Sequence, residues 1–121
     1  MTGYIACGMT GIDLFNWPHF EAWERKLTDA GWHIVSPTRI DEAVGSVIVT
    51  RDDDGSVLDV QTSAKFKYEA ILSVDFIAIE HWCDAIILLP GWETSSGAKR
   101  ELEHAESLGL RVFTAEEALN V

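Results

Sequence analysis

The sequence predicts an α/β domain of three layers, in which helices cover both faces of a parallel sheet. Short apolar runs of strand length alternate with longer segments whose apolar residues recur at helical spacing. Their order is β-α-β-(excursion)-α-β-α-β-α, and this alternation is typical of a parallel sheet. With 121 residues, 47% of them hydrophobic, the chain has the size of a single domain over residues 1–121.

The first strand is predicted at residues 4–7, and a loop with two glycines follows at 8–11. Asn16 is expected to cap the first helix. This helix has apolar residues at helical spacing and a terminating glycine: Phe20, Trp23, Leu27, Ala30 and Gly31. The second strand is predicted at residues 32–35, where a Ser-Pro pair halts it.

Residues 40–62 form an excursion between the second strand and the next helix, which we interpret as a possible hairpin or lid. Two β-prone runs, 47–50 and 57–60, flank a polar turn. A long helix is then expected from about residue 63 to 81. One of its faces is expected to carry the apolar residues Phe66, Ala70, Ile71, Val74 and Ile77.

The third strand is predicted at 85–89, and the helix that follows begins near Ser95. This helix carries an apolar stripe and ends at a glycine: Leu102, Ala105, Leu108 and Gly109. A fourth strand is expected at 111–113. Thr114 and Glu117 then match the capping box of a short last helix.

The formal net charge of −11 argues against binding to the backbone of a nucleic acid polymer, which requires clustered Lys and Arg. A small phosphorylated ligand remains possible, because backbone amides and hydroxyls can hold phosphate. No apolar run approaches the roughly 18 residues of a membrane span, and the start lacks a basic signal region. Together with two cysteines, Cys7 and Cys83, that form no disulfide framework, these features favour a cytoplasmic protein.

Metal and cofactor motifs are not recognisable in the chain. The four histidines form no H-x-H or H-E-x-x-H pair. Placing Gly55 at the sixth position of a calcium loop puts Thr50 and Gln61 where acidic ligands belong, so the acidic run at 52–54 is expected to be a solvated turn. The loop at 8–11 matches neither G-x-G-x-x-G nor a P-loop, and we expect neither a metal nor a cofactor.

The most informative segment runs from residue 85 to 101. An apolar strand ends at a Pro-Gly pair, a hydroxyl-rich loop follows, and a helix opens near Ser95. The free N–H groups and the dipole of a helix start favour an anionic ligand. Ligands of parallel sheets bind beyond the carboxyl ends of the strands, which selects the loops at 7–11, 36–39 and 90–97.

Glu101 lies one turn inside this helix. At 100° per residue it lies on or beside the sheet-facing stripe of Ala98, Ala105 and Leu108. A carboxylate there is costly unless it has a partner or a function. Glu101 is therefore either a functional carboxylate aimed at a bound ligand or a solvated or packed helix residue. Ser95 and Ser96 either contact that ligand or are ordinary helix caps.

Two segments of the chain carry a family resemblance. One is Tyr4-Ile5-Ala6-x-x-Met9-Thr10-Gly11 with Phe15-Asn16-x-Pro18-x-Phe20, and the other is Cys83-Asp84-Ala85-Ile86-x-Leu88-Leu89-Pro90-Gly91-Trp92-Glu93-x-Ser95-x-Gly97-Ala98. They resemble the DUF4406 family, common in bacteriophages and bacteria, which is similar to the nucleoside 2-deoxyribosyltransferases and the related nucleotide N-glycoside hydrolases. Outside residues 40–62, the resemblance implies a flavodoxin- or Rossmann-like domain of nucleoside 2-deoxyribosyltransferase type.

The resemblance also implies roles for individual residues. The superfamily pattern G-x-x-x-E-x-x-x-A matches Gly97, Glu101 and Ala105, and its Glu is the nucleophile on the anomeric carbon. Ser95 would meet a 5′-phosphate, together with Ser96 and the Gly97 amide. The loop after the first strand would bind sugar or phosphate through Cys7, Gly8, Met9 and Thr10, although relatives usually carry Gly-Pro where this chain has Cys7-Gly8.

Two further residues match less closely. Asp75 lies nine residues before Asp84, whereas the catalytic acid of the superfamily lies eight before, so Asp75 is either that acid or a surface residue. Asp84 opens a strand and is better interpreted as structural. Trp92 would form part of the pocket wall or stack on a base.

The function implied by the resemblance is cleavage or transfer at the N-glycosidic bond of a nucleoside or nucleoside 5′-monophosphate. A non-catalytic module that binds or sequesters a nucleotide signal is the main alternative, and a structural or interaction protein with a packed, hydrogen-bonded Glu101 is a third. Five tryptophans and the apolar long helix favour a homodimer or higher homo-oligomer, which relatives also form.

Overall fold

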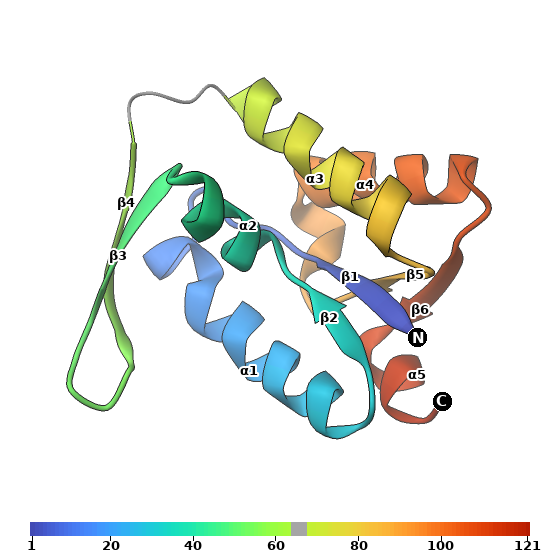
Figure 1. Cartoon of the computed structure of the whole chain (residues 1–121), viewed down its shortest axis with the longest axis horizontal. Helices are drawn as coiled ribbons and strands as arrows, with labels where there is room; N and C mark the ends of the chain where they lie inside the picture. The colour runs from blue at the N-terminus through green and yellow to red at the C-terminus, as the bar shows by residue number, and fades with distance from the viewer. Residues whose placement is uncertain (64–67) are drawn as a thin grey trace.

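The computed structural model describes residues 1–63 and 68–121 and contains a four-stranded parallel sheet (Figure 1). The strands are β1 (Thr2–Ala6), β2 (His33–Val35), β5 (Ala85–Leu88) and β6 (Arg111–Thr114). They lie in the order β2-β1-β5-β6, and Tyr4 of β1 pairs with Val35 on one side and Ile86 on the other. The α/β class with a parallel sheet is thus confirmed, and it is consistent with a Rossmann-like fold.

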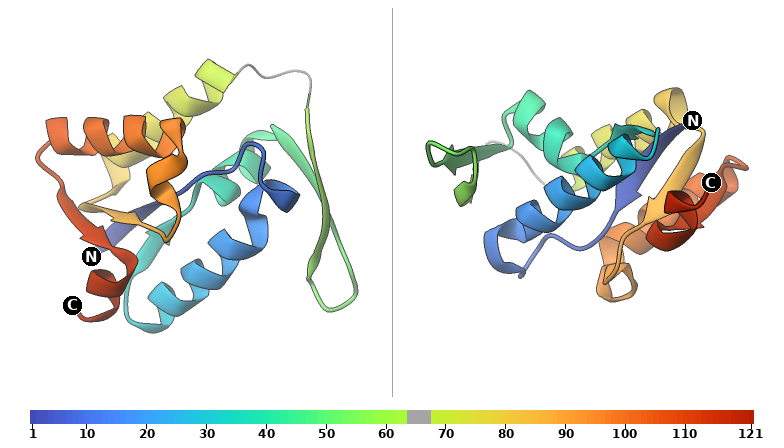
Figure 2. Two further views of the ribbon diagram at one scale, coloured as in Figure 1. Left: turned by 180° about the vertical axis from the view of Figure 1, so that it is seen from behind. Right: turned by 90° about the horizontal axis from the view of Figure 1, so that it is seen from below.

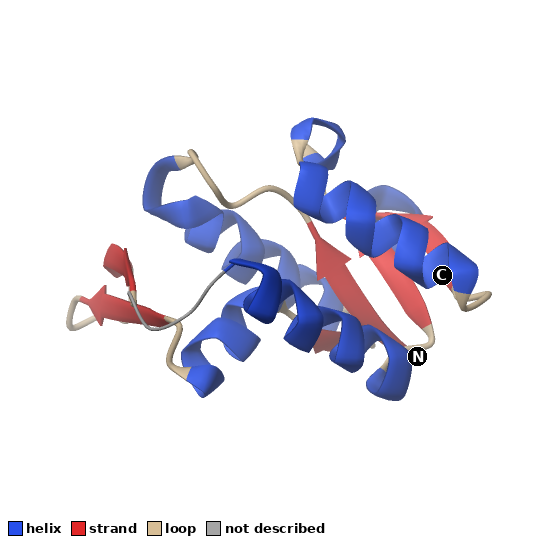
Figure 3. Cartoon of the chain, turned by 90° about the horizontal axis from the view of Figure 1, so that it is seen from above, coloured by secondary structure: helices blue, strands red, loops and turns tan. Residues whose placement is uncertain are grey.

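Helices cover both faces of the sheet (Figures 2 and 3). One face packs against α1 (Trp17–Asp29) and α5 (Ala115–Leu119), and the other packs against α2 (Pro37–Val44), α3 (Tyr68–Trp82) and α4 (Ser96–Ser107). Successive strand residues point to opposite faces, so Ile5 joins the first core and Tyr4 the second. The three predicted layers are therefore present.

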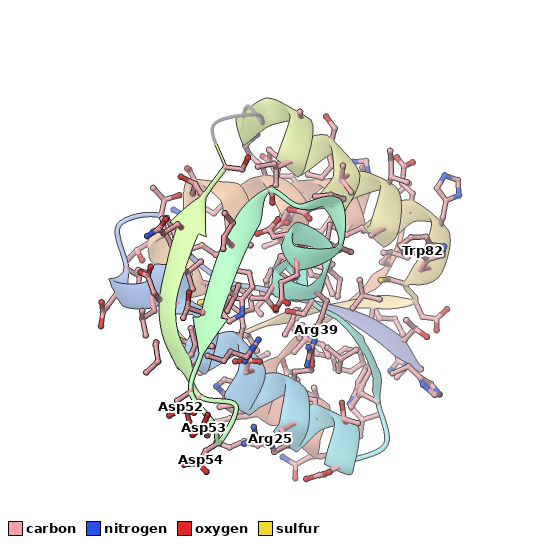
Figure 4. The ribbon with its side chains drawn as sticks, turned by 60° about the vertical axis from the view of Figure 1, so that its left-hand side comes forward. Arg25, Arg39, Asp52, Asp53, Asp54 and Trp82 are labelled. Carbon is pink, nitrogen blue, oxygen red and sulfur yellow. The ribbon has the colours of Figure 1, made fainter. Side chains whose placement is uncertain are left out.

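The excursion contains an antiparallel hairpin, as one of the two interpretations predicted. Its strands are β3 (Val47–Arg51) and β4 (Val57–Thr62), and they form a separate ribbon that extends beyond α1 and α2 (Figure 1). The acidic run lies at the tip of the ribbon (Figure 4). There the Asp52 carboxylate accepts hydrogen bonds from the backbone N–H groups of Asp54 and Ser56, at 3.0 and 2.9 Å. This is the solvated turn expected from the sequence.

The helix α2 within the same excursion was not predicted. Ser36 and Pro37 halt β2, but they also begin this helix. The Ser36 hydroxyl caps it by accepting a hydrogen bond from the Thr38 N–H at 3.3 Å, and Pro37 occupies the first turn. Gly45 ends it in the left-handed conformation, at φ 78°.

The prediction that Asn16 caps α1 is wrong, because a short 3₁₀ helix over Asp13–Asn16 precedes α1. Asn16 has a left-handed backbone, with φ 61°, and its side chain makes no capping hydrogen bond to α1. The Asn16 amide instead donates to the Gly8 carbonyl at 2.9 Å and to the Cys7 sulfur at 3.6 Å. The residue expected to cap the helix therefore holds the loop after β1.

The expected apolar face of α3 is also wrong in part. Ala70 and Ile77 are exposed, whereas the buried side of this helix carries Leu72, Asp75, Ala78 and Ile79. Phe66 and the predicted helix start at 64–67 lie outside the described residues. Apolar residues occur on almost every side of this segment, so their spacing does not determine which side packs.

The last third of the chain follows the prediction with one exception. Thr114 and Glu117 form the reciprocal capping box of α5, and Gly109 follows α4 with φ 75°. Asp84 accepts a hydrogen bond from the Thr2 N–H at 3.0 Å, which ties two strand starts together. Leu108 is the exception, because it lies beyond α4 and is 43% exposed. Within the described residues, no helix is long and apolar enough to span a bilayer.

Candidate functional site

A cleft of about 800 Å³ opens at the carboxyl ends of β1 and β5. The chain leaves β1 toward β2 on one side and later returns to β5 on the other, so this is the point where the strand order reverses. Such switch points are where open α/β sheets bind ligands. The lining comes from the loop after β1, from α2, from the open end of the ribbon where β3 begins and β4 ends, from α3 and from the start of α4.

The cleft brings together all the predicted site residues except Trp92. These are Cys7, Gly8, Met9, Thr10, Asp75, Ser95, Ser96, Gly97 and Glu101. Trp92 lies in the short 3₁₀ helix Trp92–Thr94 and packs, half-buried, against the core on the side of α2, α3 and α4. The structure therefore does not place its ring in the wall of the cleft.

The start of α4 forms one wall of the cleft. The Ser95 hydroxyl caps the helix by accepting from the Ala98 N–H at 3.0 Å, which is the ordinary capping role considered for this residue. The N–H groups of Ser96 and Gly97 precede the first complete helical turn, so no carbonyl of the helix pairs with them. This wall offers amides, hydroxyls and the positive end of a helix dipole to a ligand.

The loop after β1 forms a second wall, close to the first. A Cβ atom at Gly8 would lie 3.3 Å from the Cβ of Ser95, so the close approach of the two loops favours glycine. The Cys7 thiol donates to the Pro90 carbonyl at 3.4 Å and accepts from Asn16. Burial raises the pKa of this thiol, so Cys7 is a neutral group that links the loops after β1 and β5.

Two carboxyl groups and a phenol form the floor of the cleft. Glu101 of α4 and Asp75 of α3 are 5% and 6% exposed, and Tyr4 of β1 is completely buried. The Tyr4 hydroxyl donates a hydrogen bond to Oε2 of Glu101, and Asp75 interacts with the same carboxylate, although the Oδ1 atom of Asp75 has no hydrogen-bond partner among the described residues. Glu101 is thus buried and hydrogen-bonded in a polar cluster that faces the cleft, which excludes a solvated helix residue and agrees with both a functional carboxylate and a packed, hydrogen-bonded residue.

The cluster favours one negative charge over two. Burial raises the pKa of Asp75 well above its ordinary value, and the charge of Glu101 raises it further. Burial raises the pKa of Glu101 as well, but the hydrogen bonds that its carboxylate accepts from Tyr4 and Asp75 oppose the rise. Both pKa values are raised, that of Asp75 more than that of Glu101, so as the pH rises Glu101 loses its proton first and the remaining proton is on Asp75.

The family of domains of unknown function designated DUF4406 matches residues 1–114 of the chain. The chain belongs to this family. The match includes every residue that lines the cleft and ends just before α5. A search of curated proteins found no match to the chain.

One cleft residue of this DUF4406 protein was not predicted from the sequence. Asp41 of α2 is 6% exposed and lines the cleft, and its Oδ1 atom has no hydrogen-bond partner among the described residues. Burial raises the pKa of Asp41 to about 6, although a hydrogen bond from Ser46 opposes the rise. The signal was present in Ser36-Pro37, because a helix that begins there places Asp41 one turn after Pro37 on the same face.

The DUF4406 cleft is acidic. Its described lining residues include three buried carboxyl groups and no Lys or Arg. Within residues 1–63 and 68–121, no group of three or more His, Cys, Asp or Glu side chains is arranged to hold a metal ion. The site therefore offers a ligand hydrogen bonds, a helix dipole and carboxyl chemistry.

Proposed function

We propose that the cleft cleaves or transfers the N-glycosidic bond of a nucleoside or nucleoside 5′-monophosphate, with Glu101 as the nucleophile. The single observation that carries the proposal is the buried Asp75–Glu101 pair at the floor of a ligand-sized cleft, in which Asp75 remains an acid at a pH where Glu101 is already a carboxylate. This reaction needs both forms at once. The resemblance to nucleoside 2-deoxyribosyltransferases supports the same assignment.

In the first step, an electron pair of the Glu101 carboxylate forms a bond to C1′ of the sugar. The bond between C1′ and the base nitrogen breaks, and its electron pair leaves with the base. Asp75 donates its proton to that base and becomes a carboxylate. Because Glu101 loses its charge as the ester forms, the interaction that holds the proton on Asp75 weakens when the base needs it.

In the second step, water or a second base attacks C1′ and displaces Glu101 as a carboxylate. Asp75 takes up the proton that the attacking group loses, which restores the starting pair. Two inversions give net retention at C1′, as in two-step glycosidases. The oxocarbenium-like transition state is positive, and an acidic cleft stabilises it.

The wall at the start of α4 suits the 5′ end of the sugar. Ser95, Ser96 and the Gly97 amide can hold a 5′-hydroxyl or a phosphate through hydrogen bonds and the helix dipole. Since the described lining contains no basic side chain, a phosphate would depend on these groups alone. Nucleosides and their 5′-monophosphates are therefore both required as test substrates.

The test is chromatographic detection of free base from a panel of nucleosides and nucleoside 5′-monophosphates. Glu101→Gln is expected to abolish base release and to leave ligand-induced thermal stabilisation intact. Glu103→Gln on the exposed side of the same helix is the matched control and should retain activity. Equal base release by the wild type and Glu101→Gln would show that Glu101 is not the nucleophile.

A second measurement distinguishes the proposed enzyme from the main alternative, a non-catalytic module that binds nucleotides. Stabilisation of the wild type by a nucleotide, with no base released over hours, would favour a module that binds or sequesters nucleotides. Mass spectrometry of the wild type mixed with substrate provides a positive counterpart, because a glycosyl ester on Glu101 adds the mass of the sugar to the peptide that contains it.

A further inference from the structure

Asp41 presents an acceptor that nothing in the described protein uses. Its side chain is 6% exposed and lines the cleft, and its Oδ1 atom lacks a hydrogen-bond partner among the described residues. Buried polar atoms are nearly always paired, and an unpaired one is costly. Oδ1 has almost no accessible surface in the free protein, so a donor that the ligand brings pairs with it after rotation of the Asp41 carboxyl group toward the cleft.

The position of Asp41 indicates which part of the ligand it meets. The helix α3 packs against both α2 and α4, and the sheet order places α2 near the β2 edge and α4 near β5 and β6. Asp41 and the α4 wall are consequently on different sides of α3. A sugar whose C1′ is at Glu101 and whose 5′ end is at Ser95–Gly97 has its base directed away from the α4 wall.

The surroundings of Asp41 suit a flat aromatic ring. Pro37 precedes it by one helical turn on the same face, and Val47, Ile71 and Leu72 complete an apolar lining. Within this lining, the Asp41 carboxylate is a polar group that can accept a hydrogen bond from the ring edge. The Tyr4–Glu101–Asp75 cluster is near enough for the charge of Asp41 to raise the pKa of each of its members, so Asp41 lies beside the proposed catalytic pair.

We propose that Asp41 determines base specificity by accepting a hydrogen bond from the exocyclic amino group of an amino-bearing nucleobase. This inference rests on the proposed function and names the substrate class of the same site. A carboxylate has acceptors only, so it pairs with the amino group of adenine, cytosine or guanine. It repels the keto oxygen that replaces this group in hypoxanthine or uracil, which adds discrimination against keto bases.

The experiment measures dissociation constants by calorimetry in the Glu101→Gln background, in which the ligands are not consumed. The probes are two pairs of deoxynucleosides, and the members of each pair differ only in whether the base carries an amino group or a keto oxygen. The pairs are deoxyadenosine with deoxyinosine and deoxycytidine with deoxyuridine. Each compound is tested with and without a 5′-phosphate. The amino member of the pair that binds is expected to bind about tenfold or more tightly. Asp41→Asn offers a donor as well as an acceptor, so it should reduce the ratio to about threefold or less, or reverse it.

Matched variants distinguish a failure of the inference about Asp41 from a failure of the proposed function. Asp53→Asn, at the exposed tip of the ribbon, makes the same chemical change away from the cleft and should leave the ratio unchanged. Equal affinities for amino and keto members, or an unchanged ratio in Asp41→Asn, would overturn the inference while the proposed function stands. Equal weakening of all ligands by Asp41→Asn would assign Asp41 to the sugar and also overturn it. If none of the ligands binds, the proposed function fails and this inference fails with it.

Discussion

Replacement of Asp41 by Asn should stabilise the folded protein, and the gain should depend on pH. The side chain is almost completely buried, and burial raises its pKa from 3.8 to about 6. Below pH 3.8 the carboxyl is neutral in both the folded and the unfolded states, so burial carries no ionisation cost. Between the two pKa values the unfolded chain loses the proton while the folded chain keeps it, and the free energy of unfolding falls as the pH rises.

The size of the effect follows from the shift. A difference of about two pKa units between the folded and unfolded states corresponds to about 3 kcal/mol in the free energy of unfolding. The wild type loses this contribution completely above about pH 6. Asn is neutral at every pH, and the Ser46 hydroxyl donates to the backbone carbonyl of residue 41 at 3.2 Å, so the substitution leaves that hydrogen bond in place. The stabilisation by Asp41→Asn should therefore grow by up to about 3 kcal/mol between pH 4 and pH 8, equivalent to a rise of roughly 12 °C in Tm for a chain of this length.

Urea unfolding of both proteins at five pH values from 4 to 8 measures this difference. The other carboxyl groups titrate in both proteins, and the comparison therefore reports Asp41 together with the effect of its charge on the pKa values of Asp75 and Glu101. Asp53→Asn, which changes an exposed carboxylate, should show a small difference that hardly varies with pH. A difference between the wild type and Asp41→Asn that is constant across the range, or that favours the wild type at pH 8, would refute the reasoning.

Four further expectations concern the same structure. Activity should be highest between the two apparent pKa values of the Asp75–Glu101 pair, both above the ordinary carboxyl range, and a pH–rate profile that stays flat from pH 5 to 10 would contradict the shared proton. Tyr4→Phe removes a donor to Glu101, so the acidic limb of that profile should move to higher pH, while an unmoved limb would count against the hydrogen bond. Gly8→Ala places a Cβ 3.3 Å from Ser95, so ligand affinity measured by calorimetry should fall more than Tm does. The homo-oligomer stays a prediction, and light scattering at micromolar concentration would show it, with exposed apolar side chains such as Trp82 on α3 covered in the interface (Figure 4).

Local signals in the sequence were sufficient for most of the fold. The strands, the capping box at Thr114 and the hairpin turn at 52–56 each follow from residues close together in the chain, and the structure contains all of them. The helix α2 was missed because Ser36-Pro37 serves both as a strand stop and as a helix start, and eight residues give little periodicity. The prediction of the buried face of α3 was wrong for the opposite reason. Apolar residues occur on almost every side of this helix, so no polar face shows which side packs.

The candidate site was only partly accessible to the same reasoning. Spacing placed Glu101 on the sheet-facing stripe, and the structure places it at the floor of the cleft. Its partners lie 97 and 26 residues earlier in the chain, at Tyr4 and Asp75, and meet it only through the pairing of β1 with β5 and the packing of α3 on α4. Tyr4 was interpreted as an ordinary strand residue, because nothing in a single strand shows which face will carry a carboxylate.

The two faces of the sheet differ in the buried polar residues beside them, and this difference explains why the candidate site lies on one face. The core under α1 and α5 is formed by apolar side chains, and the indole N–H of its buried Trp32 donates to the Ala118 carbonyl at 2.9 Å. The buried polar residues of the described chain belong to the segments of α2, α3 and α4 or to the turns beside them: Ser36, Thr38, Asp41, Ser46, Asp75 and Glu101. Burial of these groups costs free energy that apolar packing on the first face must offset. Three buried carboxyl groups in one cleft are costly for a chain of this size unless they are used or paired, and the Oδ1 atoms of both Asp41 and Asp75 have no hydrogen-bond partner among the described residues.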